Sequence, residues 1–189
     1  MKKLSLCLML ALFGFAVNAQ TTPIKFPAID PSPMDAVYYP LNAVKVKKED
    51  TSMPIIKVVY SRPMKKGREI FGVLEQFDKV WRLGANENTE ISFAKSVTIG
   101  GKRIKAGTYS LFAIPNKDKW TIIVNKQTDR WGAFNYDQAK DVVRVDVPIT
   151  RFEKVLEAFS MTFTEAADEA NLVMAWDTTQ AILPIQFKK

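Results

Sequence analysis

The sequence predicts an all-β protein: an antiparallel β-sandwich or jelly roll, preceded by an irregular proline-rich N-terminal arm. Two observations support this prediction. After residue 55, apolar residues recur with a period of two or stand in short runs rich in β-branched residues, and turn-forming residues separate these segments. Between residues 20 and 40, five prolines disfavour regular structure, because proline fixes φ and lacks an amide donor.

The first 19 residues have the features of a cleavable export signal. Two lysines precede an apolar run from Leu4 to Val17, and the run ends in the small-x-small pattern Val17-Asn18-Ala19. The run is shorter than the ~20 residues that span a membrane. We therefore expect residues 1–19 to be removed before Gln20. The mature chain is expected to be periplasmic or secreted and to have no integral membrane segment.

The length of the mature chain suits one domain. Removal of the leader leaves 189 − 19 = 170 residues, enough to bury one core without disulfides. The single cysteine, Cys7, lies in the leader, so thiol chemistry is not expected in the mature chain. We expect residues 20–54 to form the arm and a first strand, and residues 55–189 to form a single β-sandwich domain.

The first predicted strands lie between residues 55 and 124. The run 55–60 is rich in β-branched residues and stops at Arg62-Pro63. Residues 91–98 alternate between apolar and polar, and Gly100-Gly101 joins this run to residues 102–104 in a hairpin. Residues 109–114 and 120–124 form a second hairpin around the polar turn 116–119.

The remaining predicted strands follow after residue 142. Residues 143–149 and 159–163 alternate as half-buried strands, and residues 172–176 and 185–187 complete the series. The stretch 150–158 stays open, because Glu153, Lys154 and Glu157 fit one exposed helical turn but no sustained period of 3.6 supports a helix.

Composition excludes several classes of function. Histidine is absent, which removes the commonest general base and imidazole metal ligands. No acidic cluster is dense enough to predict a metal site, and no cofactor is expected. Without the leader the chain has 25 basic and 20 acidic residues, a surplus of five spread along its length. This dispersed charge, in an exported chain, does not predict nucleic-acid binding.

Two polar and aromatic stretches form the candidate functional site. Residues 60–90 concentrate three arginines with tryptophan, amide and carboxylate groups, and residues 129–137 add a second aromatic and polar loop. Arginine binds carboxylates bidentately and tryptophan stacks on sugar faces, so the set suits an acidic or neutral glycan or another small polar ligand. The candidate ligand-binding residues are Arg62, Arg68, Trp81, Arg82, Asn86, Glu87, Trp131 and Tyr136.

Other interpretations of the same residues stay open. The arginines could pair with Glu87 or Glu90 to fix loops, while Trp131 and Tyr136 cover the core. The chain would then be a non-catalytic envelope scaffold. Alternatively, Tyr136 could transfer protons in a glycan lyase with Arg82 neutralising the substrate, or Glu87 and Asp137 could form a glycosidase pair. The sequence favours binding over catalysis and leaves the oligomeric state open.

Several of these segments also carry a family resemblance. Over residues 55–178 the chain resembles the bacterial family called domain of unknown function 2911, and Pro33-Met34-Asp35 and Tyr38-Tyr39-Pro40 are similar to the N-terminal segment of one subgroup. The resemblance implies an exported β-rich protein, and no activity or catalytic residue comes with it. The segments that carry it are Tyr60-Ser61-Arg62-Pro63, Gly67-Arg68, Ile70-Phe71-Gly72, Trp81-Arg82 with Gly84-Ala85-Asn86-Glu87, Ala106-Gly107-Thr108-Tyr109-Ser110-Leu111, and Trp131-Gly132 with Tyr136.

Overall fold

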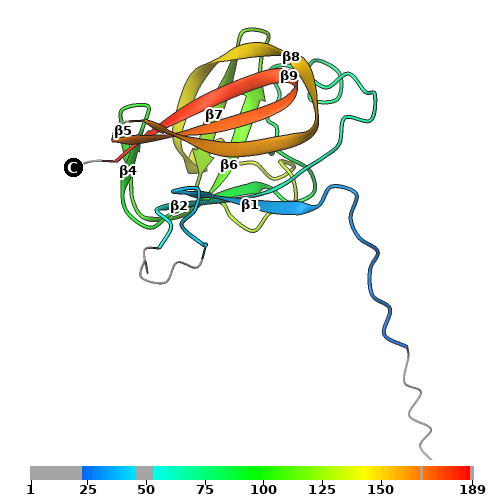
Figure 1. The fold of residues 1–189 in the computed structure, drawn as a ribbon, viewed down its shortest axis with the longest axis horizontal. Coiled ribbons are helices and arrows are strands. Elements are labelled where there is room, and N and C mark those ends of the chain that lie inside the picture. The colour runs from blue at the N-terminus through cyan, green and yellow to red at the C-terminus, as the bar shows by residue number, and fades with distance from the viewer. Residues whose placement is uncertain (1–22, 46–52, 167, 188–189) are drawn as a thin grey trace, which may run out of the picture.

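The chain folds as the predicted antiparallel all-β protein (Figure 1). A computed structural model describes residues 23–45, 53–166 and 168–187. The predicted export signal, residues 1–19, lies outside the described residues. Within the described residues, nine strands and one short 3-10 helix, η1 (Gln138–Lys140), are found.

The strands form one antiparallel succession in the order β1-β2-β3-β6-β7-β8-β9-β4-β5. Both predicted hairpins are confirmed: β4 pairs with β5 around Gly100-Gly101, and β6 pairs with β7. Both of these glycines have positive φ, which a tight hairpin turn requires and which glycine adopts without steric cost. The strands are β1 (Met34–Tyr39), β2 (Ile56–Ser61), β3 (Thr89–Phe93), β4 (Val97–Ile99), β5 (Lys102–Ile104), β6 (Gly107–Pro115), β7 (Lys119–Asn125), β8 (Asp141–Ala166) and β9 (Glu169–Gln186).

The long strand β8 joins the two layers of the sandwich. Its first part, up to Pro148, pairs with β7, and its remainder, from Ile149, pairs with β9. Two register shifts, between Arg151 and Ser160, interrupt that second pairing. Such irregularities bend a strand, and Figure 1 shows β8 and β9 curving over the other strands. Residues 150–158 therefore belong to this strand and do not form a helical turn.

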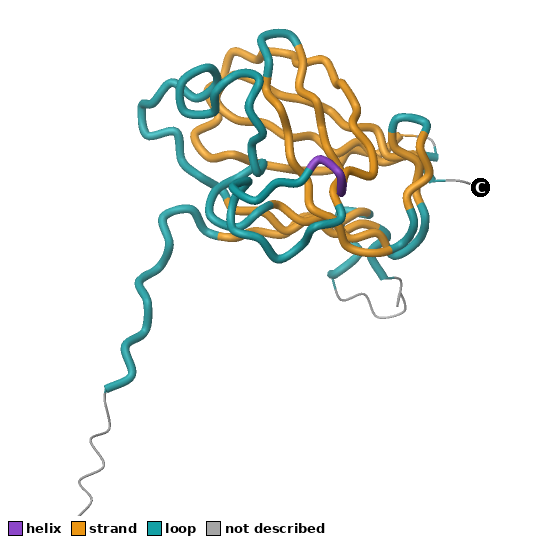
Figure 2. Tube along the Cα trace, turned by 180° about the vertical axis from the view of Figure 1, so that it is seen from behind, coloured by secondary structure: helices purple, strands orange, loops and turns teal. Residues whose placement is uncertain are grey.

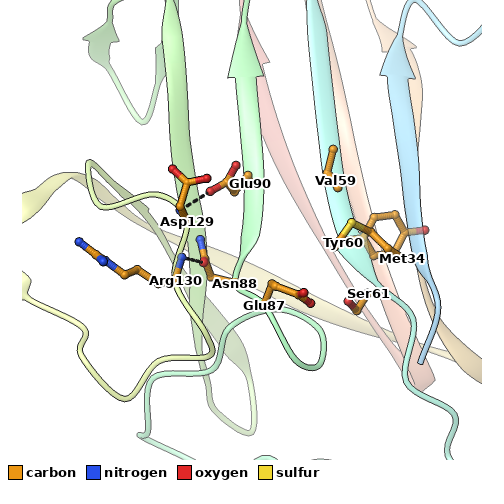
Figure 3. A pocket seen from close by; sticks show the side chains of 9 residues that line it. All are labelled: Met34, Val59, Tyr60, Ser61, Glu87, Asn88, Glu90, Asp129 and Arg130. Atoms are coloured by element: carbon orange, nitrogen blue, oxygen red, sulfur yellow. Dashed lines mark hydrogen bonds between the residues drawn. The ribbon is translucent and has the colours of Figure 1, made fainter. Parts of the chain in front are cut away.

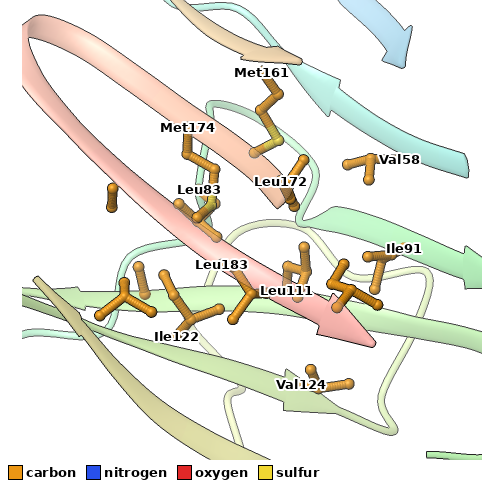
Figure 4. Close-up of a cluster of buried hydrophobic side chains, with 14 of the residues drawn as sticks. Val58, Leu83, Ile91, Leu111, Ile122, Val124, Met161, Leu172, Met174 and Leu183 are labelled. Carbon is orange, nitrogen blue, oxygen red and sulfur yellow. The ribbon is translucent and has the colours of Figure 1, made fainter. Parts of the chain in front are cut away.

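The core lies between these two layers (Figure 4). Val58, Ile91 and Leu111 from one layer and Leu172 and Leu183 from the other are fully buried. An aromatic cluster extends the core toward the loops, because the rings of Phe71, Trp81, Trp120, Phe159 and Trp176 lie in contact. Each large buried side chain contributes about 1.5–3 kcal/mol, so this core supplies stability without disulfides.

Two local predictions need correction. Residues 91–98 do not form one strand: β3 ends at Phe93 and pairs with β2 and β6, whereas β4 begins at Val97 and pairs with β5 and β9. The buried positions keep the same period of two on both sides of the break, because Phe93 and Val97 both face the core, and only the exposed Lys95 interrupts the pattern. Periodicity alone therefore does not reveal that the chain passes from one layer to the other here.

The arm is irregular only at its beginning. Residues 23–33 form no strand and extend away from the sandwich (Figure 2), with Ile24, Phe26 and Ile29 exposed. Residues 34–39 form β1, a strand within the segment 20–54 where a first strand was expected, although the prolines between residues 20 and 40 disfavour regular structure; β1 pairs with β2 over its full length. Proline is compatible with this strand because Pro33 and Pro40 stand just outside its ends.

Candidate functional site

The structure brings the two polar stretches together. The loop at residues 82–88 lies beside the loop at residues 127–136, and we call them the paired loops. Backbone hydrogen bonds join Gly132 N to Asn86 O (2.8 Å) and Asn88 N to Arg130 O (3.0 Å), and a β-bridge links Glu87 with Trp131. In addition, the Asn88 side chain accepts a hydrogen bond through its Oδ1 from Arg130 N at 2.8 Å.

A glycine is required at the centre of the paired loops. Gly132 has a φ of +66°, a conformation that other residues adopt only at a cost. A Cβ atom at this position would lie 2.6 Å from Arg82 Nη1 and about 3 Å from the Phe134 ring. The missing side chain therefore leaves the space in which the Arg82 guanidinium lies.

Arg82 lines an open cleft at one end of the paired loops, which we call the Arg82 cleft. Its volume is about 280 Å³. Arg82 makes no side-chain hydrogen bond or ion pair with the described residues, and its Nε is buried without a partner. This Nε has almost no accessible surface, whereas Arg82 as a whole is half-buried, so a ligand in the cleft would meet the exposed part of the side chain. The lining residues are Glu75, Val80, Trp81, Arg82, Ala133 and Phe134.

Glu75 is the second charged group in the Arg82 cleft. Burial raises the pKa of this carboxyl from its ordinary 4.5 to about 7, although the nearby charges of Arg82 and Arg68 oppose the rise. Glu75 forms no ion pair with Arg82. Near neutral pH the cleft thus contains an unpaired guanidinium and a carboxyl that exists in both protonated and ionised forms.

The aromatic residues of the two stretches separate into core and surface. Trp81 is only 3% exposed, and its indole nitrogen donates to Gly84 O at 3.1 Å, so it packs in the aromatic core and presents little surface to the cleft. Phe134 is 80% exposed and Trp131 is 60% exposed. Phe134 therefore supplies the accessible ring of the Arg82 cleft, while Trp131 lies beside Glu87 through their backbone bridge.

Arg62 and Arg68 have structural contacts outside this cleft. Arg62 pairs with Asp35 Oδ2 at 3.0 Å and also donates to Phe159 O and Ser160 Oγ, which ties β1 and β2 to β8. Arg68 donates to the backbone carbonyls of residues 64 and 65. Among the described residues, none of the three candidate arginines forms an ion pair with Glu87 or Glu90; the structural contacts of Arg62 and Arg68 are with other partners.

Tyr136 and Asp137 also lie outside the Arg82 cleft. The Tyr136 hydroxyl donates to Asp141 Oδ2 at 2.6 Å and accepts from Arg144 Nη2 at 2.6 Å. Burial, together with Asp141, raises the Tyr136 pKa to about 12, which disfavours proton transfer near neutral pH. Asp137 caps η1 by accepting from Ala139 N at 2.9 Å. The structure therefore assigns both side chains to the packing of the loop.

Glu87 lines a second cleft, at the other end of the paired loops, which we call the Glu87 cleft (Figure 3). Asn86, its neighbour, contributes a backbone carbonyl to the loop pairing. The eight residues proposed from the sequence therefore do not form one site. Trp81 and Arg82 line the Arg82 cleft, Glu87 lines the Glu87 cleft, and the others line neither cleft. Sequence reasoning missed Glu75, Phe134 and Ser61, because no spacing or composition distinguishes them from other surface and strand residues.

Comparison with known proteins agrees with the resemblance seen in the sequence. A family model described as "Protein of unknown function (DUF2911)" matches residues 40–185. The chain belongs to this family. The DUF2911 match includes both paired loops and both clefts except Met34, which precedes it. Neither curated proteins nor solved structures gave a match.

Metal-ligand groups and membrane-spanning helices are both absent from the described residues of this DUF2911 protein. The part of the chain that the structure describes contains no group of three or more acidic, histidine or cysteine side chains arranged to hold a metal ion. It also contains no helix long and apolar enough to cross a membrane.

Proposed function

We propose that this DUF2911 protein is exported and binds a polar ligand that carries an acidic group, such as an acidic glycan, in the Arg82 cleft. The observation that supports this proposal is the position of Arg82: it lines an open cleft, its side chain makes no hydrogen bond or ion pair with the described residues, and the nearby Glu75 does not pair with it.

The chemistry of the cleft suits a sugar acid. A guanidinium donates two parallel hydrogen bonds to a carboxylate, and the protein itself supplies no such acceptor to Arg82 among the described residues. The exposed Phe134 ring offers an apolar face to the C–H groups of a sugar ring. In its protonated form, the Glu75 carboxyl can donate to a hydroxyl or carboxylate oxygen, and it no longer repels an anion.

Export is supported by the leader pattern of residues 1–19. In that compartment a ligand-binding protein meets cell-wall and extracellular glycans, many of which carry uronic or other sugar acids. The absence of cysteine from the mature chain is compatible with such a location, because the buried core alone supplies the stability of the fold.

A calorimetric titration of the mature chain, residues 20–189, tests this proposal. The ligands are galacturonate and glucuronate oligosaccharides and their neutral galactose and glucose counterparts. The acidic sugars should bind, the neutral ones should bind at least ten-fold more weakly, and Arg82→Lys should lose most of the affinity because lysine lacks the planar fork. Arg103→Lys, at an exposed position of β5, is the matched control. Equal binding to Arg82→Lys and wild type would refute the assignment of the cleft.

A second candidate function is glycan cleavage at the same cleft. The observation that favours it is the Glu75 pKa of about 7, since an acid or base with such a pKa exchanges protons readily at neutral pH. Glu75→Gln should then abolish turnover of a bound acidic glycan while leaving binding within a few-fold of wild type. Absence of product from wild-type protein with a ligand that binds tightly would leave binding as the function.

A further inference from the structure

The Glu87 cleft is a separate pocket that shares no lining residue with the Arg82 cleft. It lies where the start of β1 and the end of β2 meet the paired loops, and its volume is about 210 Å³ (Figure 3). Ligand pockets for drug-sized molecules begin at about 300 Å³, so this cleft suits a smaller molecule or a single side chain. Its lining residues are Met34, Val59, Tyr60, Ser61, Glu87, Asn88, Glu90, Asp129 and Arg130.

One hydroxyl that lines this cleft has no partner in the described part of the protein and keeps some accessible surface. Ser61 is 3% exposed and lines the cleft, and its side chain makes no hydrogen bond with the described residues. The Glu87 carboxylate extends toward Ser61 in Figure 3 and also has no hydrogen bond or ion pair among them. Two oxygen acceptors that the protein itself leaves unused therefore face the same space.

The charge of the cleft is negative. Three carboxylates line it, from Glu87, Glu90 and Asp129, against one guanidinium, that of Arg130. Figure 3 shows the Arg130 side chain extending away from Glu87 and Ser61. One oxygen of the Glu90 carboxylate already has a partner, because Oε1 accepts a hydrogen bond from Asp129 N at 2.7 Å. Glu87 is thus the carboxylate best placed to meet a cation, and an anionic ligand would be repelled.

The remaining wall is apolar. Met34 and Val59 contribute side chains to the cleft, which adjoin the polar end formed by Glu87 and Ser61. A hydrated metal ion gains nothing from such a wall, whereas an aliphatic chain is stabilised by each CH₂ group that it buries there. The cleft therefore combines an acidic end and an apolar side.

We propose that the Glu87 cleft binds an alkylammonium group, with the ammonium between the Glu87 carboxylate and the Ser61 hydroxyl and the aliphatic stem against Met34 and Val59. An ammonium donates three hydrogen bonds and accepts none, which matches a cleft of unused acceptors. The group can belong to a free amine or to a lysine side chain of another polypeptide. This site goes beyond the proposed function and does not depend on it.

Titration calorimetry on the mature chain tests the site with three probes: 1,5-diaminopentane, pentan-1-ol and Nα-acetyl-lysine methylamide. The diamine should bind and the alcohol, which has the same stem without the charge, should not. The lysine amide should also bind, and the tighter of the two amines identifies the source. Failure of both amines to bind, or equal binding of the alcohol, would overturn the proposal.

Two variants locate the site, and one serves as control. Glu87→Gln should weaken diamine binding ten-fold or more, because a hydrogen bond to a charged group is worth about 1.5–3 kcal/mol. Ser61→Ala should weaken it a few-fold. Glu153→Gln, at an exposed position of β8, should bind like wild type. Since Glu87 is exposed, its variant should fold normally, and unchanged diamine affinity in folded Glu87→Gln would overturn the assignment.

Discussion

The raised pKa of Glu75 gives the protein a stability that falls as the pH rises. Burial raises this pKa from 4.5 to about 7, so the folded state holds the proton more tightly than the unfolded chain. The group's stabilising contribution is complete below about pH 4.5 and is lost as the pH rises through about 7. At about 1.4 kcal/mol for each pKa unit, the loss is about 2–3 kcal/mol when the partial exposure of Glu75 is allowed for.

Urea denaturation between about pH 5 and pH 8 measures this contribution. Glu75→Gln keeps the shape of the side chain and removes its titration. The free energy of unfolding of wild type should therefore fall relative to this variant by about 2–3 kcal/mol across the range, equivalent to roughly 4–12 °C in melting temperature. Glu153→Gln, at an exposed position, should track wild type.

A constant difference between wild type and Glu75→Gln at every pH would refute the reasoning. It would mean that Glu75 is ionised in the folded protein and is already compensated, most simply by Arg82. The Arg82 guanidinium would then have a partner, and the observation that supports ligand binding in the Arg82 cleft would be lost. In Arg82→Ala, the loss of stability with rising pH should occur at a higher pH than in wild type, because removal of that positive charge raises the Glu75 pKa further.

Three further predictions test other parts of the structure. Trp81→Ala should cost about 3–5 kcal/mol in urea denaturation because it empties the aromatic core, and a loss below about 1 kcal/mol would contradict its burial. A double-mutant cycle of Arg62→Ala and Asp35→Ala should give a coupling free energy of about 0.5–1 kcal/mol, since both side chains are partly exposed. A coupling of zero would show that this ion pair does not stabilise the packing of β1. Gly132→Ala should cost about 1 kcal/mol through its positive φ and should weaken acidic-ligand binding by displacing Arg82, so unchanged affinity would place the ligand elsewhere.

Much of the fold was predictable because its signals are local. Alternation depends only on which face of a strand each residue occupies, and Gly100-Gly101 marks a turn through its own backbone freedom. The layer change at residues 94–96 was not predicted, because the apolar positions keep the same period on both sides and a single lysine such as Lys95 also occurs at exposed positions within a continuous strand. A first strand was expected within residues 20–54, but its bounds were not predicted, because flanking prolines have the same local signature whether they border a strand or an irregular segment.

The candidate site was predictable only in its location. Composition identified the two stretches, and they do meet as the paired loops. The role of each side chain depends on partners distant in the sequence: Arg62 pairs with Asp35 across 27 residues, and Trp81 packs against Trp176. Burial is also what distinguishes Glu75 from other surface carboxylates, and the sequence around it carries no periodic pattern that predicts that burial.

The placement of β9 has a consequence for how the chain reaches its folded state. Strand β9 contributes the buried residues Leu172, Met174 and Leu183, and it pairs with β4 through Thr98 and Gln186, which are 88 residues apart. Contacts between such distant positions form slowly, because a long loop must close before they are made. During synthesis the first layer therefore exposes its apolar face until the last strand emerges. The risk of aggregation is greatest in that interval, and a chaperone would protect the chain most effectively then.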